Sequence, residues 1–381
     1  MKVTLGSFRF LTLLTGLLLL LACTGLPVRG TVGGQTIDTR VDSEVARYYL
    51  ASYLAGKHGD ALLDQRIDRI YQSNGNLPDR SELKRLSDEF SSDFAALYLA
   101  DQIAREPVNR RFRSAFDQAY EYTRKAFPEG RVSLPAAAVD YEILFVPTYL
   151  YKRITLTGAD LAAPRAALQK VGFTCHFVET QDDGAVEANA DFVIAAIQAR
   201  AQSGRRLIIV SASKSGPEVA LALTRLGPEK SRHVAAWINT VGALQGSPMA
   251  DERLAPELDY MVGKVDGAGR ESVTTERSRQ RFDSFHVPKH VFVVNYFGIP
   301  VTGSISFLAS RSFFPLRKYG PNDGVLLLSD MIFPGGVTLA ELGSDHFLLN
   351  DHLDVTAVAL AATVIRWLEN QDHPMSPAPG N

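Results

Sequence analysis

Residues 207–216 read Leu207-Ile208-Ile209-Val210-Ser211-Ala212-Ser213-Lys214-Ser215-Gly216, and they decide the fold. Four aliphatic residues in a row predict a buried strand, and the apolar pattern over 218–226 predicts a helix directly after it. A serine at a sharp strand-to-helix turn needs small neighbours two positions away on each side, because the two backbones come close together there. Ser211 and Ser215 are small enough, although glycine is commoner at both positions. The stretch therefore favours a nucleophilic Ser213 over a serine-rich turn that only caps the helix.

Short apolar runs alternate with helical segments on both sides of this unit. The runs that predict strands cover 141–146, 174–178, 207–210, 234–238 and 290–296, and the helical segments between them cover 160–171, 184–201 and 216–226. This alternation predicts βαβ units and a mostly parallel central sheet, and strands that are apolar throughout indicate helices on both faces. We assign 136–370 to this α/β domain, which ends in the apolar helix 355–368.

A nucleophilic serine of this kind is followed along the chain by an acid and then by a histidine. His346 is the best candidate for the histidine, because it lies between the strand-like run 337–342 and the last helix. His352 falls at the start of that helix and His373 in the tail. The best candidate for the acid is Asp323, in a turn 23 residues before His346.

Two other aspartates compete with Asp323. They are Asp330 and Asp345, and the second adjoins the histidine, so its side chain would seldom face the imidazole. An Asn-Asp-Gly sequence such as 322–324 is also common in turns that have no catalytic role.

The loop after the strand that ends at Val146 predicts one half of an oxyanion hole. A backbone N–H of Thr148 or Tyr149 and the backbone N–H of Lys214 would hold the negative oxygen that forms during acyl transfer. Tyr149 and Tyr151 could line a substrate pocket or pack in the core. We do not expect the Lys214 amine to act as the general base, because a histidine is present.

From about residue 141 to 368 the chain resembles the α/β-hydrolase superfamily, near its lipase and esterase branch. The resemblance rests on residues 146–149, 211–216, 321–324 and 345–347, and on residues 246–251, which are similar to a lipase segment between core and lid. It implies a serine hydrolase that acts on carboxylic esters without a metal or an organic cofactor. Two residues differ from the usual pattern: Thr148 stands where lipases carry glycine or histidine, and serines flank the elbow.

The segment before this domain has a different pattern. Residues 38–135 show apolar residues at helical spacing and no clear strand, which predicts a helical accessory region that packs on the main domain or faces a partner. The charged segment 251–288 predicts a lid or cap insertion, or a solvated surface insertion. Residues 371–381 are rich in proline and predict a disordered tail.

The first residues have the pattern of an export signal. Lys2 and Arg9 precede an apolar segment that is shorter than the ~20 residues that span a bilayer. Residues 20–23 read Leu-Leu-Ala-Cys, which is similar to the processing site of bacterial lipoproteins. We therefore predict a signal peptide over 1–22, a lipidated Cys23 that anchors the protein in the cell envelope, and a flexible tether over 23–37. The alternative is an ordinary signal peptide with an incidental cysteine.

The second and last cysteine, Cys175, lies in an apolar run and is expected to be a buried residue without a disulfide partner. The net charge is −2, from 40 basic and 42 acidic residues, and no basic run indicates a nucleic-acid partner. The leading hypothesis is thus an exported esterase or lipase that acts on an ester or lipid-like molecule. The alternatives are an acyltransferase, amidase or thioesterase of the same fold, and a non-catalytic lipoprotein that binds a lipid or a protein.

Overall fold

The computed structural model describes residues 25–73, 77–154, 157–252, 267–349 and 352–372. The predicted signal peptide, Cys23 and most of the predicted tail lie outside these ranges. Within the ranges, no helix is both long and apolar enough to cross a membrane.

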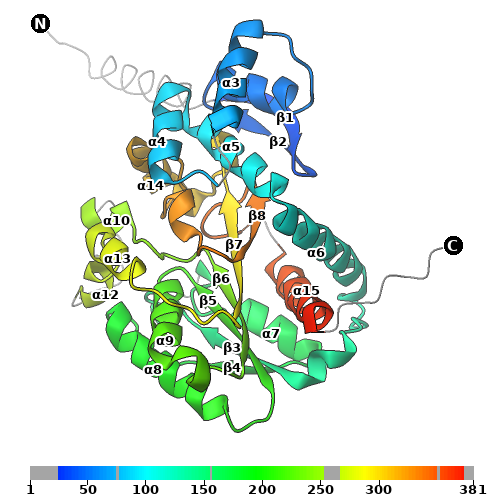
Figure 1. Ribbon diagram of the computed structural model, residues 1–381, viewed down its shortest axis with the longest axis vertical. Coiled ribbons are helices and arrows are strands. Elements are labelled where there is room, and N and C mark those ends of the chain that lie inside the picture. The colour runs from blue at the N-terminus through cyan, green and yellow to red at the C-terminus, as the bar shows by residue number, and fades with distance from the viewer. Residues whose placement is uncertain (1–24, 74–76, 155–156, 253–266, 350–351, 373–381) are drawn as a thin grey trace, which may run out of the picture.

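A six-stranded sheet forms the centre of the molecule (Figure 1), and its strand order is β4-β3-β5-β6-β7-β8. All neighbouring strands are parallel. The strands are β3 (Tyr141–Val146), β4 (Thr174–Phe177), β5 (Arg206–Ala212), β6 (Val234–Thr240), β7 (Phe292–Ile299) and β8 (Val337–Leu342). The parallel α/β architecture predicted from the alternating pattern is confirmed.

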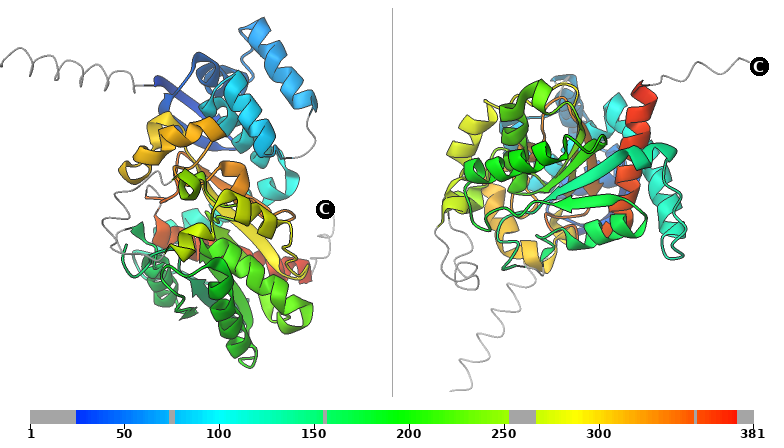
Figure 2. Two further views of the ribbon diagram at one scale, coloured as in Figure 1. Left: turned by 90° about the vertical axis from the view of Figure 1, so that its left-hand side faces the viewer. Right: turned by 90° about the horizontal axis from the view of Figure 1, so that it is seen from below.

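Helices cover both faces of the sheet (Figure 2). On one face, α8 (Val186–Arg200) and α9 (Ser215–Lys230) pack side by side, and Ile197 and Leu223 belong to the core beneath them. On the other face, α7 (Ala162–Lys170) and α15 (Leu353–Asp372) enclose a larger core that includes Leu168 and Leu360. Burial on both faces explains why the central strands are apolar throughout.

The flexible tether predicted over 23–37 is wrong for the described residues, because residues 26–41 have regular structure. They form an antiparallel hairpin of β1 (Leu26–Val32) and β2 (Gln35–Val41), which the sequence did not predict. Gly33 and Gly34 supply the positive φ angles of the turn, 57° and 86°. The alternation of the strands buries Val28, Val32 and Val41, and this burial stabilises two short strands that would be marginal alone.

The helical region that follows the hairpin is confirmed, and it packs on the α/β domain. Its elements are α2 (Glu44–Tyr48), the π-helical turn η1 (Tyr49–Tyr53), α3 (Ala61–Ser73), α4 (Arg80–Glu89), α5 (Ser92–Arg105) and α6 (Pro107–Ala126). Figure 1 shows α3, α4 and α5 gathered at one end of the molecule, with α6 running alongside α15. Phe94 and Phe112 belong to the same core as the sheet residues Ile143 and Phe297.

This N-terminal region also covers the sheet edge at β8. The Asn109 Oδ1 accepts a hydrogen bond of 2.8 Å from Thr338 N, and the Arg113 guanidinium contacts Glu341 at 3.1 Å. An uncovered edge strand presents unpaired backbone groups to other chains. The region therefore closes an edge of the sheet.

Further short elements connect the core strands. They are η2 (Ala136–Asp140), α10 (Pro248–Glu252), α12 (Ala268–Glu271), α13 (Thr275–Phe282), η4 (Thr302–Ser304), α14 (Phe307–Leu316), η5 (Arg317–Tyr319) and η6 (Leu328–Met331). Residues 253–266 of the predicted lid lie outside the described residues. The part that follows is held to the core, because Arg281 on α13 pairs with Glu187 on α8 at 2.8 Å.

Candidate active site

Ser213 lies at the junction between β5 and α9, at the carboxyl edge of the sheet. Its φ of 52° is in the left-handed region, which a non-glycine residue adopts only when the surrounding structure holds it there. Three backbone hydrogen bonds fix this conformation. Ser213 N donates to Thr240 O at 3.0 Å, and Ser213 O accepts from Gly216 N and Ala243 N at 3.0 and 2.9 Å. The strained turn presents the Ser213 side chain at the end of the strand, as the sequence predicted.

The two serines that replace the usual flanking glycines each have a hydrogen-bonding partner. Ser211 Oγ accepts from the Trp237 indole N–H at 2.8 Å, and Ser215 Oγ donates to Val146 O at 2.8 Å. The close approach that demands a small residue falls instead at Gly216, where a Cβ would lie 2.9 Å from Gly242 Cα. The departure from the glycine pattern is therefore accommodated by polar contacts within the core.

Ser213, His346 and Asp323 come together although 133 residues separate the first two. His346 Nε2 lies 3.1 Å from Ser213 Oγ, and His346 Nδ1 lies 2.7 Å from Asp323 Oδ2. The Asp323 side chain is fully buried and that of His346 is 8% exposed. These contacts form a continuous relay from a buried carboxylate through an imidazole to a hydroxyl.

The Asp323 carboxylate is fixed by its own turn. Its Oδ1 accepts from Val325 N at 2.8 Å and Leu326 N at 2.6 Å, which leaves Oδ2 for the imidazole. A second backbone contact, from His346 N to Asp323 O at 3.0 Å, ties the two loops together. The carboxylate is thus held in one orientation by its own turn.

The competing residues have other partners. Asp330 pairs with Arg80 at 2.8 Å, and burial raises the pKa of Asp330. Asp345 accepts from Ser306 N at 2.7 Å and holds the start of α14. His352 is exposed at the start of α15, and His373 lies outside the described residues.

The oxyanion prediction needs a correction at Thr148. Its backbone N–H, one of the predicted donors, already donates to Ala159 O at 3.1 Å. Its hydroxyl is at the site instead, because Thr148 Oγ1 accepts from Lys214 N at 3.1 Å. The Lys214 N–H and the Thr148 hydroxyl are therefore in contact, and the hydroxyl was missed because the prediction considered backbone donors only.

The neighbouring aromatic and basic side chains have structural contacts. Tyr151 is 5% exposed and its hydroxyl donates to Thr180 O at 3.1 Å, so it packs in the core. Tyr149 is half-buried, and its ring edge lies against Gly269 on α12. The Lys214 ammonium pairs with Glu218 inside the protein, which removes it from the role of general base.

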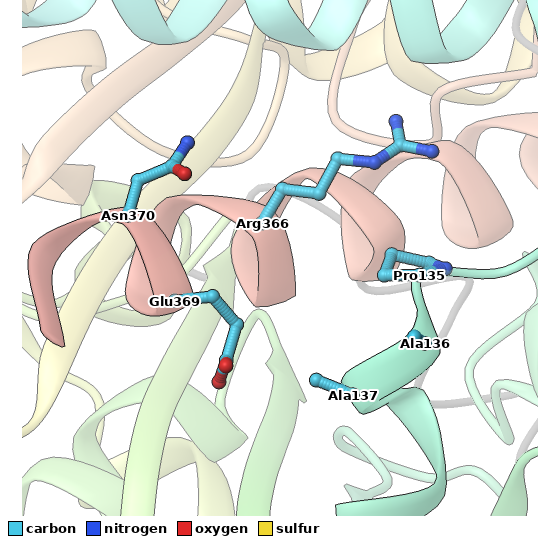
Figure 3. Close-up of a pocket in the computed structure, with 6 residues that line it drawn as sticks. All are labelled: Pro135, Ala136, Ala137, Arg366, Glu369 and Asn370. Carbon is cyan, nitrogen blue, oxygen red and sulfur yellow. The ribbon is translucent and has the colours of Figure 1, made fainter. Parts of the chain in front are cut away.

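A hollow elsewhere on the surface is unrelated to this relay (Figure 3). It lies between η2 and α15 and is lined by Pro135, Ala136, Ala137, Arg366, Glu369 and Asn370. Glu369 accepts a hydrogen bond from Tyr141, the first residue of β3, so the hollow is at the amino edge of the sheet. In the part of the chain that the structure describes, no group of three or more His, Cys, Asp or Glu side chains could hold a metal ion.

Comparison with known proteins shows similarity at the level of the fold. No protein-family model matches the chain, and no curated protein matches it. Among solved structures, a metagenomic carboxyl esterase superposes with a TM-score of 0.52 and 18% identity, covering 63% of this chain and 78% of that one. The mature form of a lipase from Bacillus licheniformis superposes with a TM-score of 0.46 and 21% identity, covering 57% of this chain and 88% of the lipase.

Proposed function

The chain has the α/β-hydrolase fold, and from this premise we propose that it is a serine hydrolase that cleaves carboxylic esters. Ser213 is the nucleophile, His346 the general base and then the general acid, and Asp323 the group that orients the imidazole. The observation that carries the proposal is the relay of 2.7 and 3.1 Å contacts from Asp323 through His346 to Ser213. A nucleophile bonded to a base that is itself oriented by a third group is the arrangement this chemistry requires.

The first half of the reaction acylates the serine. Ser213 Oγ forms a bond to the ester carbonyl carbon while its proton passes to His346 Nε2. The Asp323 carboxylate, in contact with Nδ1, stabilises the imidazolium that results. The tetrahedral intermediate then breaks its bond to the alcohol oxygen, which takes the proton from Nε2 and leaves an acyl-serine. In the second half, water repeats these steps and releases the carboxylic acid.

The developing oxyanion is held by the Lys214 N–H and the Thr148 hydroxyl. The two groups lie 3.1 Å apart and bond to each other, so the Lys214 N–H can transfer from Thr148 Oγ1 to a substrate oxygen. A hydroxyl that accepts one hydrogen bond still has its own proton to donate. Donors aimed at the place where charge develops are worth about 10²–10³ in rate each.

The relay supports chemistry over binding alone. A hydrolase fold used only to hold a lipid or a protein would not need a buried carboxylate oriented by two backbone N–H groups toward an imidazole. An acyltransferase, an amidase and a thioesterase would use the same residues with a different acceptor or leaving group. Activity on ester, amide and thioester substrates of the same acyl group separates an esterase from an amidase and a thioesterase.

The test is hydrolysis of p-nitrophenyl butyrate by the chain from Thr24 onward, beside Ser213→Ala. We expect turnover and fluorophosphonate labelling in the wild type, and loss of both in a folded Ser213→Ala. A matched control is Ser310→Ala on α14, whose hydroxyl donates to the Phe307 carbonyl of its own helix, and which should keep both. Equal turnover by Ser213→Ala would overturn the proposal.

The place of action is part of the proposal. A lipid-modified Cys23 would anchor the enzyme in the cell envelope, and the support for this is the apolar segment before Cys23 in the sequence. Expression of the full chain and of Cys23→Ser, followed by detergent phase separation, tests the anchor. Partition of both proteins into the aqueous phase would contradict it.

A further inference from the structure

The position of Lys214 is unfavourable in three respects: two concern the helix that follows it, and the third concerns the burial of its charge. It precedes α9, where the positive end of the helix dipole disfavours a cation. Its partner Glu218 comes four residues later, and a lysine before its glutamate is the weaker order for such a pair. Both side chains are buried, at 4% and 1% exposed, although a charged ammonium group is costly to remove from water. Rules broken together at one position indicate a functional constraint.

Hydrogen bonds continue from this ion pair into the next loop. Glu218 Oε1 accepts from Lys214 Nζ and from Asn189 Nδ2, the latter at 2.9 Å. Asn189 is 2% exposed, and its side-chain amide forms two hydrogen bonds with the backbone of Gln181. It donates to Gln181 O and accepts from Gln181 N, both at 3.0 Å. The ion pair is thus connected through Asn189 to the loop that follows β4.

That loop in turn holds the oxyanion turn, residues 147–152. Asp182, the residue after Gln181, accepts from Leu150 N through its carbonyl and from Lys152 N through Oδ1, both at 2.8 Å. Lys214 N reaches the same turn from the other side through Thr148 Oγ1. The contacts therefore close a ring that contains both groups of the oxyanion hole.

We propose that the buried Lys214–Glu218 ion pair is a positioning device that holds the Lys214 N–H and the 147–152 turn at one fixed separation. The inference rests on the proposed function, since it concerns the oxyanion hole of that reaction. Neither side chain touches the reacting atoms, and both act through the backbone. The separation matters because a misplacement of about 1 Å in a catalytic group can cost about 10² in rate.

Loss of the lysine would release this ring. Burial raises the pKa of Glu218, and the nearby Lys214 ammonium opposes the rise. Without that ammonium group the Glu218 side chain loses the contact that fixes its orientation, and its hydrogen bond to Asn189 is held less firmly. The turn and the elbow can then drift apart while the fold persists.

The experiment separates a positioning role from a purely structural one. Lys214→Met leaves a buried acid without its partner, and Lys214→Met/Glu218→Gln removes both charges. We expect the melting temperature to fall in the single variant and to recover in the double variant. In both we expect kcat to fall about 10- to 100-fold with KM little changed. The inhibition constant of an alkylboronic acid, which forms a tetrahedral anion on the serine, should rise by the same factor.

A matched control removes the cation of a different ion pair, one that joins two elements away from the site. Arg113→Met breaks the half-buried contact between α6 and Glu341 on β8, and should lower the melting temperature with kcat unchanged. If the double variant regains wild-type kcat with its stability, the ion pair is structural and the inference is wrong. If Ser213→Ala is as active as wild type, the proposed function itself fails, which is a separate result. If Lys214→Met does not fold, the kcat values of the double variant and of Glu218→Gln decide between a positioning role and a structural role.

Discussion

The cluster around Asp323 and the cluster around Asp93 are both built on a buried carboxylate, but their hydrogen bonds end in different places. Asp323 uses one oxygen for two backbone N–H groups of its own turn and the other for His346. The second nitrogen of His346 then contacts Ser213 Oγ at 3.1 Å. The chain of contacts ends on a partly exposed hydroxyl.

Asp93 lies where the N-terminal region meets the α/β domain. Its Oδ2 accepts from Asp42 N at 2.8 Å and Thr302 N at 3.0 Å, and its Oδ1 accepts from Arg317 at 2.8 Å. Arg317 also contacts the Asp42 carboxylate at 3.2 Å. These contacts join segments up to 224 residues apart, so the cluster holds two regions together.

The comparison indicates how a buried carboxylate can be interpreted. Both carboxylates are buried, and each has a cationic or imidazole partner, so these two features do not distinguish the clusters. The difference is where the contacts end: those of Asp323 lead through His346 to the Ser213 hydroxyl, and those of Asp93 join the backbone and the Arg317 guanidinium of other segments. The same substitution, aspartate to asparagine, should therefore have opposite effects at the two places.

The largest effect is expected for Asp323→Asn. The amide donates to His346 Nδ1 where the carboxylate accepted, which favours the wrong tautomer and removes the charge that stabilises the imidazolium. We expect kcat on p-nitrophenyl butyrate to fall by about 10⁴-fold. The melting temperature should change little, because the amide oxygen can still accept from Val325 N and Leu326 N. A lower melting temperature with unchanged kcat would mean that Asp323 stabilises the fold and takes no part in the reaction.

A smaller effect on activity is expected for Thr148→Val. Valine keeps the shape of threonine and removes only the hydroxyl, so kcat should fall by about 10²–10³ with KM nearly constant. Thr148→Ser is the matched control, because it restores the hydroxyl and should recover most of the rate. If valine and serine are equally active, the hydroxyl is not an oxyanion donor.

The residues of the relay could be predicted from the sequence for a physical reason. Ser213, Asp323 and His346 each lie in a segment that follows a strand, and the carboxyl ends of parallel strands share one edge. Chain order and strand boundaries therefore suffice to bring them to the same edge. The parallel sheet was predictable on the same grounds, because strands buried on both faces are apolar throughout.

Other parts of the site depend on contacts that no local pattern records. The contact of the Thr148 hydroxyl with Lys214 N, and that of the Thr148 N–H with Ala159 O, join residues 66 and 11 positions apart. The hairpin 26–41 was missed because its glycines resemble a linker, and its strands depend on burial and on contacts with β8 that lie far away in the sequence. The spacing of Lys214 and Glu218 was visible in the sequence, but their burial was not.

The Asp93 cluster predicts a dependence of stability on pH. Burial raises the pKa of Asp93 to about 6 against an unfolded value of 3.8, although Arg317 opposes the rise. Below about pH 4 the carboxyl is protonated in both states, and the contribution to stability is fully present. As the pH rises through 6 the folded state loses the proton and that contribution is lost. The free energy of unfolding should therefore fall between pH 4 and 7 by more in the wild type than in Asp93→Asn.

Denaturant unfolding at several pH values measures this difference. The quantity to compare between the two proteins is the slope of the free energy of unfolding against pH. Asp93→Asn changes the baseline stability as well, because its amide N–H would face the donors Asp42 N or Thr302 N. The kcat of the folded variant should equal that of the wild type, in contrast to Asp323→Asn. If the free energy of unfolding changes with pH in the same way in the wild type and in Asp93→Asn, Asp93 does not titrate in this range.

The smallest effect is expected at the hairpin, for Gln35→Ala. The Gln35 amide donates to Ala340 O at 3.0 Å and accepts from Leu342 N at 2.9 Å, so it pairs with β8 as a neighbouring strand would. Its loss leaves two backbone groups of the edge strand without this partner, at a cost of about 1–3 kcal/mol in the free energy of unfolding. Faster amide exchange at Leu342 would locate the loss, and Gln35→Glu, which keeps the acceptor alone, should protect that amide. Unchanged exchange at Leu342 would mean that the hairpin does not secure β8, and that the edge depends on Asn109 and Arg113 instead.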